Sequence, residues 1–85
     1  MQLASIQRTV MDVITDFLAA DPTDQEILDF YLPADLQARA HYLLEQNGED
    51  LLTEAEQEEM TRFMQVDEMM ALLKAKIHLK HKRQS

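Results

Sequence analysis

Residues 53–77, TEAEQEEMTRFMQVDEMMALLKAKI, decide the fold of this chain. Thr53 and Glu56 have the spacing of a capping box, in which each side chain accepts a hydrogen bond from a backbone N–H at a helix start. Apolar residues then recur at alternating steps of three and four, the spacing of a heptad seam: Phe63, Val66, Met70, Leu73 and Ile77. Because neither Gly nor Pro interrupts the run, the sequence predicts one helix over about 54–82.

This helix is long for so small a chain. At about 1.5 Å per residue it measures roughly 45 Å, whereas a compact chain of 85 residues has a radius of gyration of about 12 Å. Its far half must pack on another chain, stand in solvent or fray. We expect a homo-oligomer, with a dimer favoured, whose contact residues are Met60, Phe63, Val66, Met69, Met70, Leu73 and Ile77. A Met70→Asp substitution is then expected to weaken association.

Four methionines of the long helix lie on two of its sides: Met60, Met64, Met69 and Met70. A single seam cannot bury all of them. Methionine fills irregular gaps in cores and also builds adaptable binding surfaces. The pattern therefore leaves two interpretations open, core packing or a second contact face for a partner or a sister chain.

The sequence before residue 53 predicts shorter helices. Apolar residues from Leu3 to Phe17 repeat the three-four spacing, so we expect a first helix over 3–20 that ends at Asp21-Pro22, because proline disfavours the helical conformation in the residue before it. Thr23 and Glu26 form a second capping box and predict a short helix that continues to about Tyr31.

A third helix is predicted over about 34–46, with Pro33 suited to its first position. Asn47-Gly48 offers the left-handed residue that commonly closes a helix. We expect this helix and the long one to form a helical hairpin. The fold class is thus all-α, three to four helices in one domain over 1–77, followed by a basic tail over 78–85 that we expect to fray.

Composition excludes some classes of protein. The chain has no cysteine, so neither disulfides nor thiolate chemistry is available to it. The N-terminal stretch lacks the basic and apolar regions of a signal peptide, and no apolar run reaches the roughly 18 residues that suggest a membrane span. We expect a cytoplasmic protein.

Charge divides the chain unequally. Residues up to Glu68 carry all 16 acidic side chains and three arginines, a net charge of −13, whereas the C-terminal part carries +5. The five basic residues are Lys74, Lys76, Lys80, Lys82 and Arg83. They complement the negative end of the helix dipole and are also possible contacts for an anion.

Several segments resemble a group of small, uncharacterised bacterial proteins, often cyanobacterial: Ile27-Leu28-Asp29-Phe30, Leu43-Leu44-Glu45-Gln46-Asn47-Gly48, Leu51-Leu52-Thr53-Glu54-Ala55-Glu56 and Leu72-Leu73-Lys74-Ala75-Lys76. That group shows an L-T-x-E-E helix start and an L-L-K-A-K ending. The resemblance covers about residues 26–77, and Ala55 and Gln57 depart from it at positions that are often acidic. It implies an all-helical fold without catalytic residues. The genes of some relatives lie beside toxin-like genes, which implies that such a protein neutralises a partner.

Residue types that could carry chemistry have simpler explanations. An EF-hand loop centred on Gly48 would start at Leu43, which offers no oxygen ligand. His78 and His81 share a helix face but lie among lysines, which repel a metal ion. The glutamates at the start of the long helix complement its dipole. We therefore predict no catalytic, cofactor-binding or metal-binding residues and no enzyme activity.

Two functions remain. The first is a non-enzymatic protein-interaction module, an antitoxin- or inhibitor-like acidic partner of a basic protein, suggested by the charge of −13 and the long amphipathic helix. The alternative is a small nucleic-acid-associated protein, in which the basic tails of a dimer contact phosphates in a salt-dependent way. The predicted third helix is unsuited to DNA, because Arg39 is its only cation beside Asp35 and Glu45.

Overall fold

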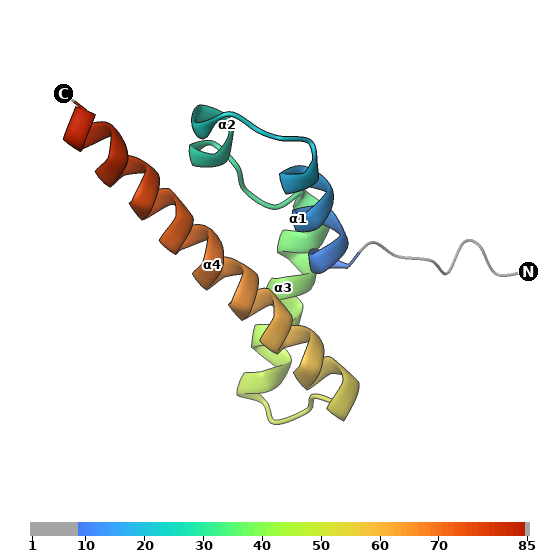
Figure 1. The fold of residues 1–85 in the computed structure, drawn as a ribbon. Coiled ribbons are helices and arrows are strands. Elements are labelled where there is room, and N and C mark those ends of the chain that lie inside the picture. The colour runs from blue at the N-terminus through green and yellow to red at the C-terminus, as the bar shows by residue number, and fades with distance from the viewer. Residues whose placement is uncertain (1–8, 85) are drawn as a thin grey trace, which may run out of the picture.

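The computed structural model describes residues 9–84, which form four α-helices and, within that range, no strand. The helices are α1 (Val10–Ala19), α2 (Asp24–Leu28), α3 (Ala34–Gly48) and α4 (Glu54–Gln84), as Figure 1 shows. The prediction of an all-α fold with a long C-terminal helix is confirmed.

Helix α4 is the element on which the other three pack, and they are arranged along its length (Figure 1). The core lies where they meet it and contains residues from all four helices: Val10, Ile14, Ile27, Leu36, Leu43, Phe63, Val66, Met70 and Ile77. Since α4 alone has 31 residues, the molecule is elongated, with extents of 50 × 34 × 18 Å.

Both predicted capping boxes are present. The Thr23 hydroxyl accepts from Glu26 N at 3.1 Å, and Glu26 Oε1 accepts from Thr23 N at 2.8 Å. At the start of α4, Thr53 and Glu56 exchange the same two bonds, both at 3.1 Å. Each box satisfies backbone N–H groups that have no partner within the helix.

Helix α1 begins later than the predicted residue 3. Thr9 has an extended backbone (φ −94°, ψ 162°) and forms a capping box with Asp12, so the helix starts at Val10. The apolar spacing of Leu3 and Ile6 suggested an earlier start, and these two residues lie outside the described range. The helix ends as predicted before Pro22, because Asp21 is left-handed with φ 57°.

The ends of α2 and α3 also differ from the predictions. Helix α2 stops at Leu28 rather than near Tyr31, and Phe30 then stacks on Phe17 of α1 with ring centroids 4.3 Å apart. The predicted closure of α3 at Asn47-Gly48 is wrong, because Gly48 is still helical. Asp50 is the left-handed residue (φ 60°), and the bonds Asp50 N to Asn47 O and Leu51 N to Gln46 O form a Schellman motif.

The basic tail, for which fraying is expected from residue 78, is helical through Gln84 in the structure. Two contacts with α2 explain this difference. Asp24 at the start of α2 accepts from Lys80 Nζ at 2.6 Å and lies 3.1 Å from His81 Nε2. About two turns earlier, the Lys74 ammonium donates to the carbonyl of Phe30, just after α2, at 2.7 Å. The short second helix thus holds the last turns of α4.

Candidate protein-binding surfaces

The heptad seam of α4 lies inside the chain's own core. Of the seven residues predicted to contact a second copy, Phe63, Val66, Met70 and Ile77 are at most 7% exposed, and Met60 and Leu73 are half-buried. Helices α1, α2 and α3 cover this seam. The assignment of the seam to an intermolecular contact is therefore corrected, since only Met69 among the seven is exposed. If α4 contacts another molecule, it must do so with its other sides.

The methionines of α4 divide between core and surface. Met70 is buried and Met60 packs against the core, whereas Met64 and Met69 are 53% and 42% exposed. Met64 faces the side of α4 next to α3, and Met69 faces a side away from the core. Core packing therefore holds for Met60 and Met70, whereas Met64 and Met69 lie at the surface.

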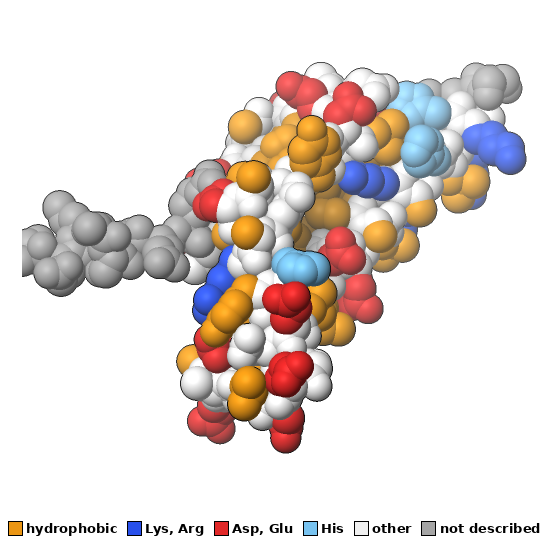
Figure 2. Space-filling model, turned by 180° about the vertical axis from the view of Figure 1, so that it is seen from behind, with side chains coloured by type: hydrophobic (Ala, Val, Ile, Leu, Met, Phe, Trp, Pro, Cys, Tyr) orange, Lys and Arg blue, Asp and Glu red, His pale blue; other side chains and the backbone are white. Residues whose placement is uncertain are grey.

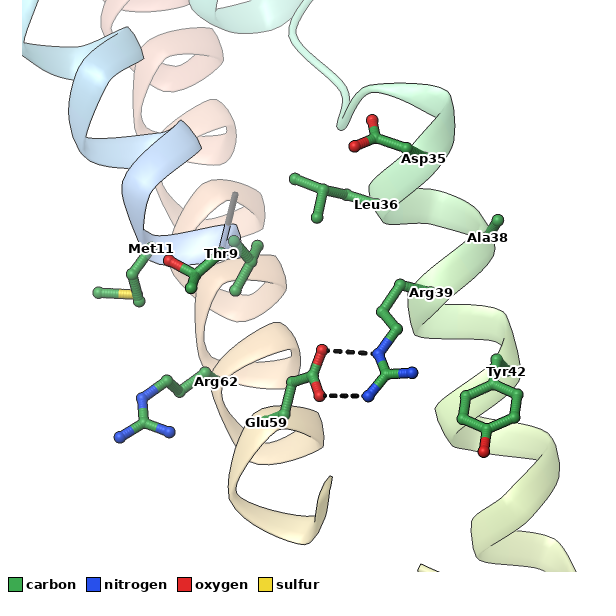
Figure 3. A pocket seen from close by; sticks show the side chains of 10 residues that line it. Thr9, Met11, Asp35, Leu36, Ala38, Arg39, Tyr42, Glu59 and Arg62 are labelled. Atoms are coloured by element: carbon green, nitrogen blue, oxygen red, sulfur yellow. Dashed lines mark hydrogen bonds and ion pairs between the residues drawn. The ribbon is translucent and has the colours of Figure 1, made fainter. Parts of the chain in front are cut away.

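A concave surface of about 1000 Å³ lies between the start of α1, α3 and α4. Figure 3 shows Glu59 of α4 reaching across to Arg39 of α3, while Arg62 points away from the pair. The Arg39 guanidinium donates two bonds to the Glu59 carboxylate, both of 2.8 Å. It also lies 3.7 Å from Glu56 and 5.0 Å from the centre of the Tyr42 ring. Its donors are thus directed at groups of the chain itself.

Electrostatics strengthen the contact between α3 and α4 at this concave surface. The hydrogen bonds from Arg39 lower the pKa of Glu59, against a smaller opposing effect of burial, and the same bonds raise the pKa of Arg39. A general base near neutral pH needs a raised carboxyl pKa. The shift of Glu59 runs in the opposite direction, so the pair serves to join α3 to α4.

A second concave surface is apolar and lies on the other side of α3. It consists of two adjoining depressions, of about 240 and 260 Å³, which share Leu32 and Asp67. We call this surface the apolar groove. One depression lies between α3 and α4, and the other between α4 and the segment that links α2 to α3. Three large side chains border the groove and remain exposed: Tyr31 at 78%, Leu44 at 57% and Met64 at 53%.

Acidic groups accompany the apolar groove. The Asp67 side chain is exposed and lines both depressions. Figure 2 shows hydrophobic side chains in the angle between α3 and α4, with acidic side chains close to them and more towards the α3–α4 loop. The one cation that lines the groove, Lys74, directs its ammonium at the carbonyl of Phe30. The groove therefore combines apolar contact area with negative charge.

The five basic residues predicted as anion contacts do not form a single patch. Lys74 and Lys80 make the contacts with Phe30 and Asp24 described above. Lys76, Lys80 and Arg83 line one depression beside Leu79, and Lys82 is exposed as well. The bond from Lys80 lowers the pKa of Asp24, which keeps a negative charge beside this cation at neutral pH.

No group of three or more His, Asp or Glu side chains within residues 9–84 is placed to hold a metal ion. His81 lies against Asp24, and His41 is 3.6 Å from Glu45 on an exposed part of α3. Within the same range, no helix combines the length and the apolar character that crossing a membrane requires.

Comparisons of this chain with protein-family models, with curated proteins and with solved structures find no match. The resemblance to small bacterial proteins therefore stays a prediction. The candidate surfaces follow from the geometry alone.

Sequence reasoning missed the apolar groove. One signal was available, because adjacent apolar pairs such as Leu43-Leu44 cannot both face one core from a helix. Leu43 is fully buried and Leu44 is 57% exposed. The pairing of Leu44 with Met64 across two helices depends on how α3 crosses α4, which the periodicity of a single helix does not determine.

Proposed function

We propose that this protein is a non-enzymatic protein-interaction module that binds a basic amphipathic helix of a partner in the apolar groove. The observation that supports this function best is the grouping of Tyr31, Leu44 and Met64, all large, apolar and exposed, around one groove. Helices bind to other proteins in this way by laying apolar side chains, spaced three or four apart, into a hydrophobic groove.

The side chains of the groove suit this kind of contact. Leu44 and Met64 border the depression between α3 and α4, whose floor is made by Leu43 and Phe63 of the core. Methionine adapts its shape to an incoming side chain more readily than branched residues do. Tyr31, beside the second depression, offers an apolar ring and a hydroxyl. Because the two depressions adjoin, they suit two successive apolar side chains of one bound helix.

The charge of the groove indicates that its partner is positively charged. Asp67 lines both depressions, and the chain carries a net charge of −8. Complementary charge speeds association and rejects partners of like sign more than it adds affinity. A helix with lysines or arginines beside its apolar face therefore fits best. This supports a role as the acidic partner of a basic protein, in the manner of an antitoxin or inhibitor.

The nucleic-acid alternative has weaker support. Phosphate binding by the tail needs several cations on one face, but Lys74 and Lys80 are directed at groups of α2 and the following segment. Asp24, which lies against Lys80, would repel a phosphate. Two of the five predicted anion contacts are thus engaged within the chain itself.

A titration with two model peptides tests the proposed function. Both peptides carry leucines at helical spacing, one with lysines and the other with glutamates at the remaining positions. We expect the lysine peptide to shift the backbone amide signals of residues 31, 44, 64 and 67, and the glutamate peptide to shift none. Leu44→Asp and Met64→Asp should each weaken binding by about tenfold, as expected for an interface anchor.

Leu51→Asp is the matched control, because Leu51 is 63% exposed but lies in the α3–α4 loop outside the groove. Equal weakening by all three substitutions would mean that the loss does not depend on the groove and would contradict the proposal. So would tighter binding to all three variants, because a lysine peptide held by charge alone gains from each added carboxylate. Capture from a host lysate with wild type and Met64→Asp, after nuclease treatment, would then identify the natural partner as a protein retained only by the wild type.

A further inference from the structure

One side of α4 is exposed along its whole length and has a heptad spacing of its own. We call it the outer face, and it includes Glu58, Gln65, Met69, Leu72, Lys76 and Arg83. Steps of three, four and seven separate these residues, so they lie in one line along the helix. All six are exposed, and the apolar members Met69 and Leu72 are 42% and 59% exposed. Leu79, 49% exposed, extends the apolar part.

Charge changes sign along the outer face. Glu58 lies near the start of α4 with the exposed Arg62 one turn after it, Gln65 is neutral, Met69 and Leu72 are apolar, and Lys76 and Arg83 lie near the end. The charge distribution of this face is complementary to that of a second copy when the two helices are antiparallel. The covered side of α4, in contrast, is occupied by α1, α2 and α3.

We propose that two copies of this chain associate through their outer faces, with the two α4 helices antiparallel and a two-fold axis near residues 70 and 71. In this register Leu72 of each copy lies opposite Met69 of the other, Gln65 lies opposite Lys76, and Glu58 lies opposite Arg83. Apolar side chains then meet at the centre, and opposite charges meet at both ends. The interface is isologous, as in most homodimers.

A parallel pairing of the same faces is disfavoured. It would place Glu58 against Glu58, Lys76 against Lys76 and Arg83 against Arg83, and like charges in such contacts oppose association. Charge complementarity thus favours a second copy of this chain as the molecule that binds the outer face, with its α4 helix antiparallel. The antiparallel dimer leaves the apolar groove of each copy open, because Met64 and the groove lie on a different side of α4.

Because the natural chain contains no cysteine, single engineered cysteines report the pairing cleanly. Gln65→Cys and Lys76→Cys are prepared separately, mixed and oxidised mildly. The proposal predicts one main covalent dimer, joining residue 65 of one copy to residue 76 of the other. Either variant oxidised alone should stay largely uncrosslinked, because residues 11 positions apart are separated by about 16 Å along a helix.

Sedimentation equilibrium tests the energetic part of the proposal. We expect the wild type to dimerise with a Kd in the micromolar range and Leu72→Asp to raise that Kd at least tenfold. Leu51→Asp, a change of the same type outside the outer face, should leave the Kd unchanged. Glu58→Arg and Arg83→Glu should each raise the Kd, and the double variant should restore it towards the wild-type value. Circular dichroism checks that the variants, all at exposed positions, keep their helix content.

Three results would overturn the proposal. The first is a wild-type chain that stays monomeric up to millimolar concentration. The second is cross-linking between identical positions, which would mean a parallel pairing. The third is a monomer whose binding to anionic vesicles or to nucleic acid is lost in Leu72→Asp, which would assign the outer face to a different occupant.

Discussion

Among single residues, Glu59 shows how one side chain joins two elements. Its carboxylate accepts two bonds of 2.8 Å from Arg39, and both side chains remain a little more than one third exposed. Exposure weakens such a pair through solvent screening, so its contribution to stability is at most about 1 kcal/mol. The two-bond geometry places it at the upper end of that range.

Glu59→Gln should lower the free energy of unfolding at pH 7 by about 0.5–1 kcal/mol. Because Arg39 lowers the folded-state pKa of Glu59 below its ordinary value of 4.5, the stabilisation is complete above that pH and is lost as the pH falls through the folded pKa. Urea unfolding at pH 7 and at pH 3 should therefore show a larger difference between variant and wild type at pH 7 than at pH 3.

Glu54→Gln provides the control for this prediction, since Glu54 is an exposed glutamate at the start of the same helix. If Glu54→Gln and Glu59→Gln lower stability equally, the effect comes from the net charge of the helix start and not from Arg39.

Single residues also show where the sequence was informative. Thr23 and Thr53 were predictable caps, because a capping box is made within four consecutive residues. The end of α3 was not, because glycine is the usual left-handed residue and Gly48 drew the prediction two positions too early. Aspartate tolerates the left-handed conformation, and Asp50 adopts it where the chain turns into α4.

At the scale of elements, the last turns of α4 depend on the short helix α2. A five-residue helix has little stability of its own, yet Asp24 at its start contacts both Lys80 and His81. The periodicity of α4 predicted a helix with an end near residue 82, but a contact between residues 57 positions apart cannot be read from a local pattern. For the same reason the apolar spacing of α4 was predictable from the sequence, whereas the helices that cover it were not.

Asp24→Asn should loosen the end of α4 without unfolding the domain. We expect backbone amides of residues 80–83 to exchange with solvent roughly two- to fivefold faster, as the loss of a surface ion pair implies. High salt should accelerate this exchange in the wild type and have little further effect on the variant.

Asp29→Asn is the comparison, because Asp29 bonds only locally, to Gln25 at 3.0 Å. The proposed contribution of Asp24 would be wrong if both variants exchanged at the wild-type rate.

For the whole molecule, the central position of α4 determines what a substitution does. Three helices pack on it, so its buried side supports the entire core while its other sides stay available. The sequence predicted the helices and the hairpin well, because capping residues and apolar spacing are local. It placed the seam at a partner because a chain of only 85 residues was expected to have too small a core to cover it.

Met70→Asp should therefore unfold the monomer instead of only weakening association. Met70 is 6% exposed and Met69 is 42% exposed, although the two are adjacent. A charge at a buried position costs several kcal/mol, so we expect Met70→Asp to remove the cooperative urea transition. Met69→Asp should stay within about 0.5 kcal/mol of the wild type, as surface substitutions do.

Both stabilities are measured at a protein concentration well below the expected dimer Kd, where association contributes little. A Met70→Asp chain that unfolds like the wild type would contradict the placement of Met70 in the core.

The distribution of methionines has a consequence for the response to oxidants. In a chain without cysteine, methionine is the side chain that peroxides attack first, and its sulfoxide is polar. Met64 in the apolar groove and Met69 on the outer face are accessible, whereas Met70 is shielded by the core. Mild oxidation would then modify both proposed contact surfaces and leave the fold intact. Because methionine sulfoxide is reduced enzymatically in cells, that loss of contacts would be reversible.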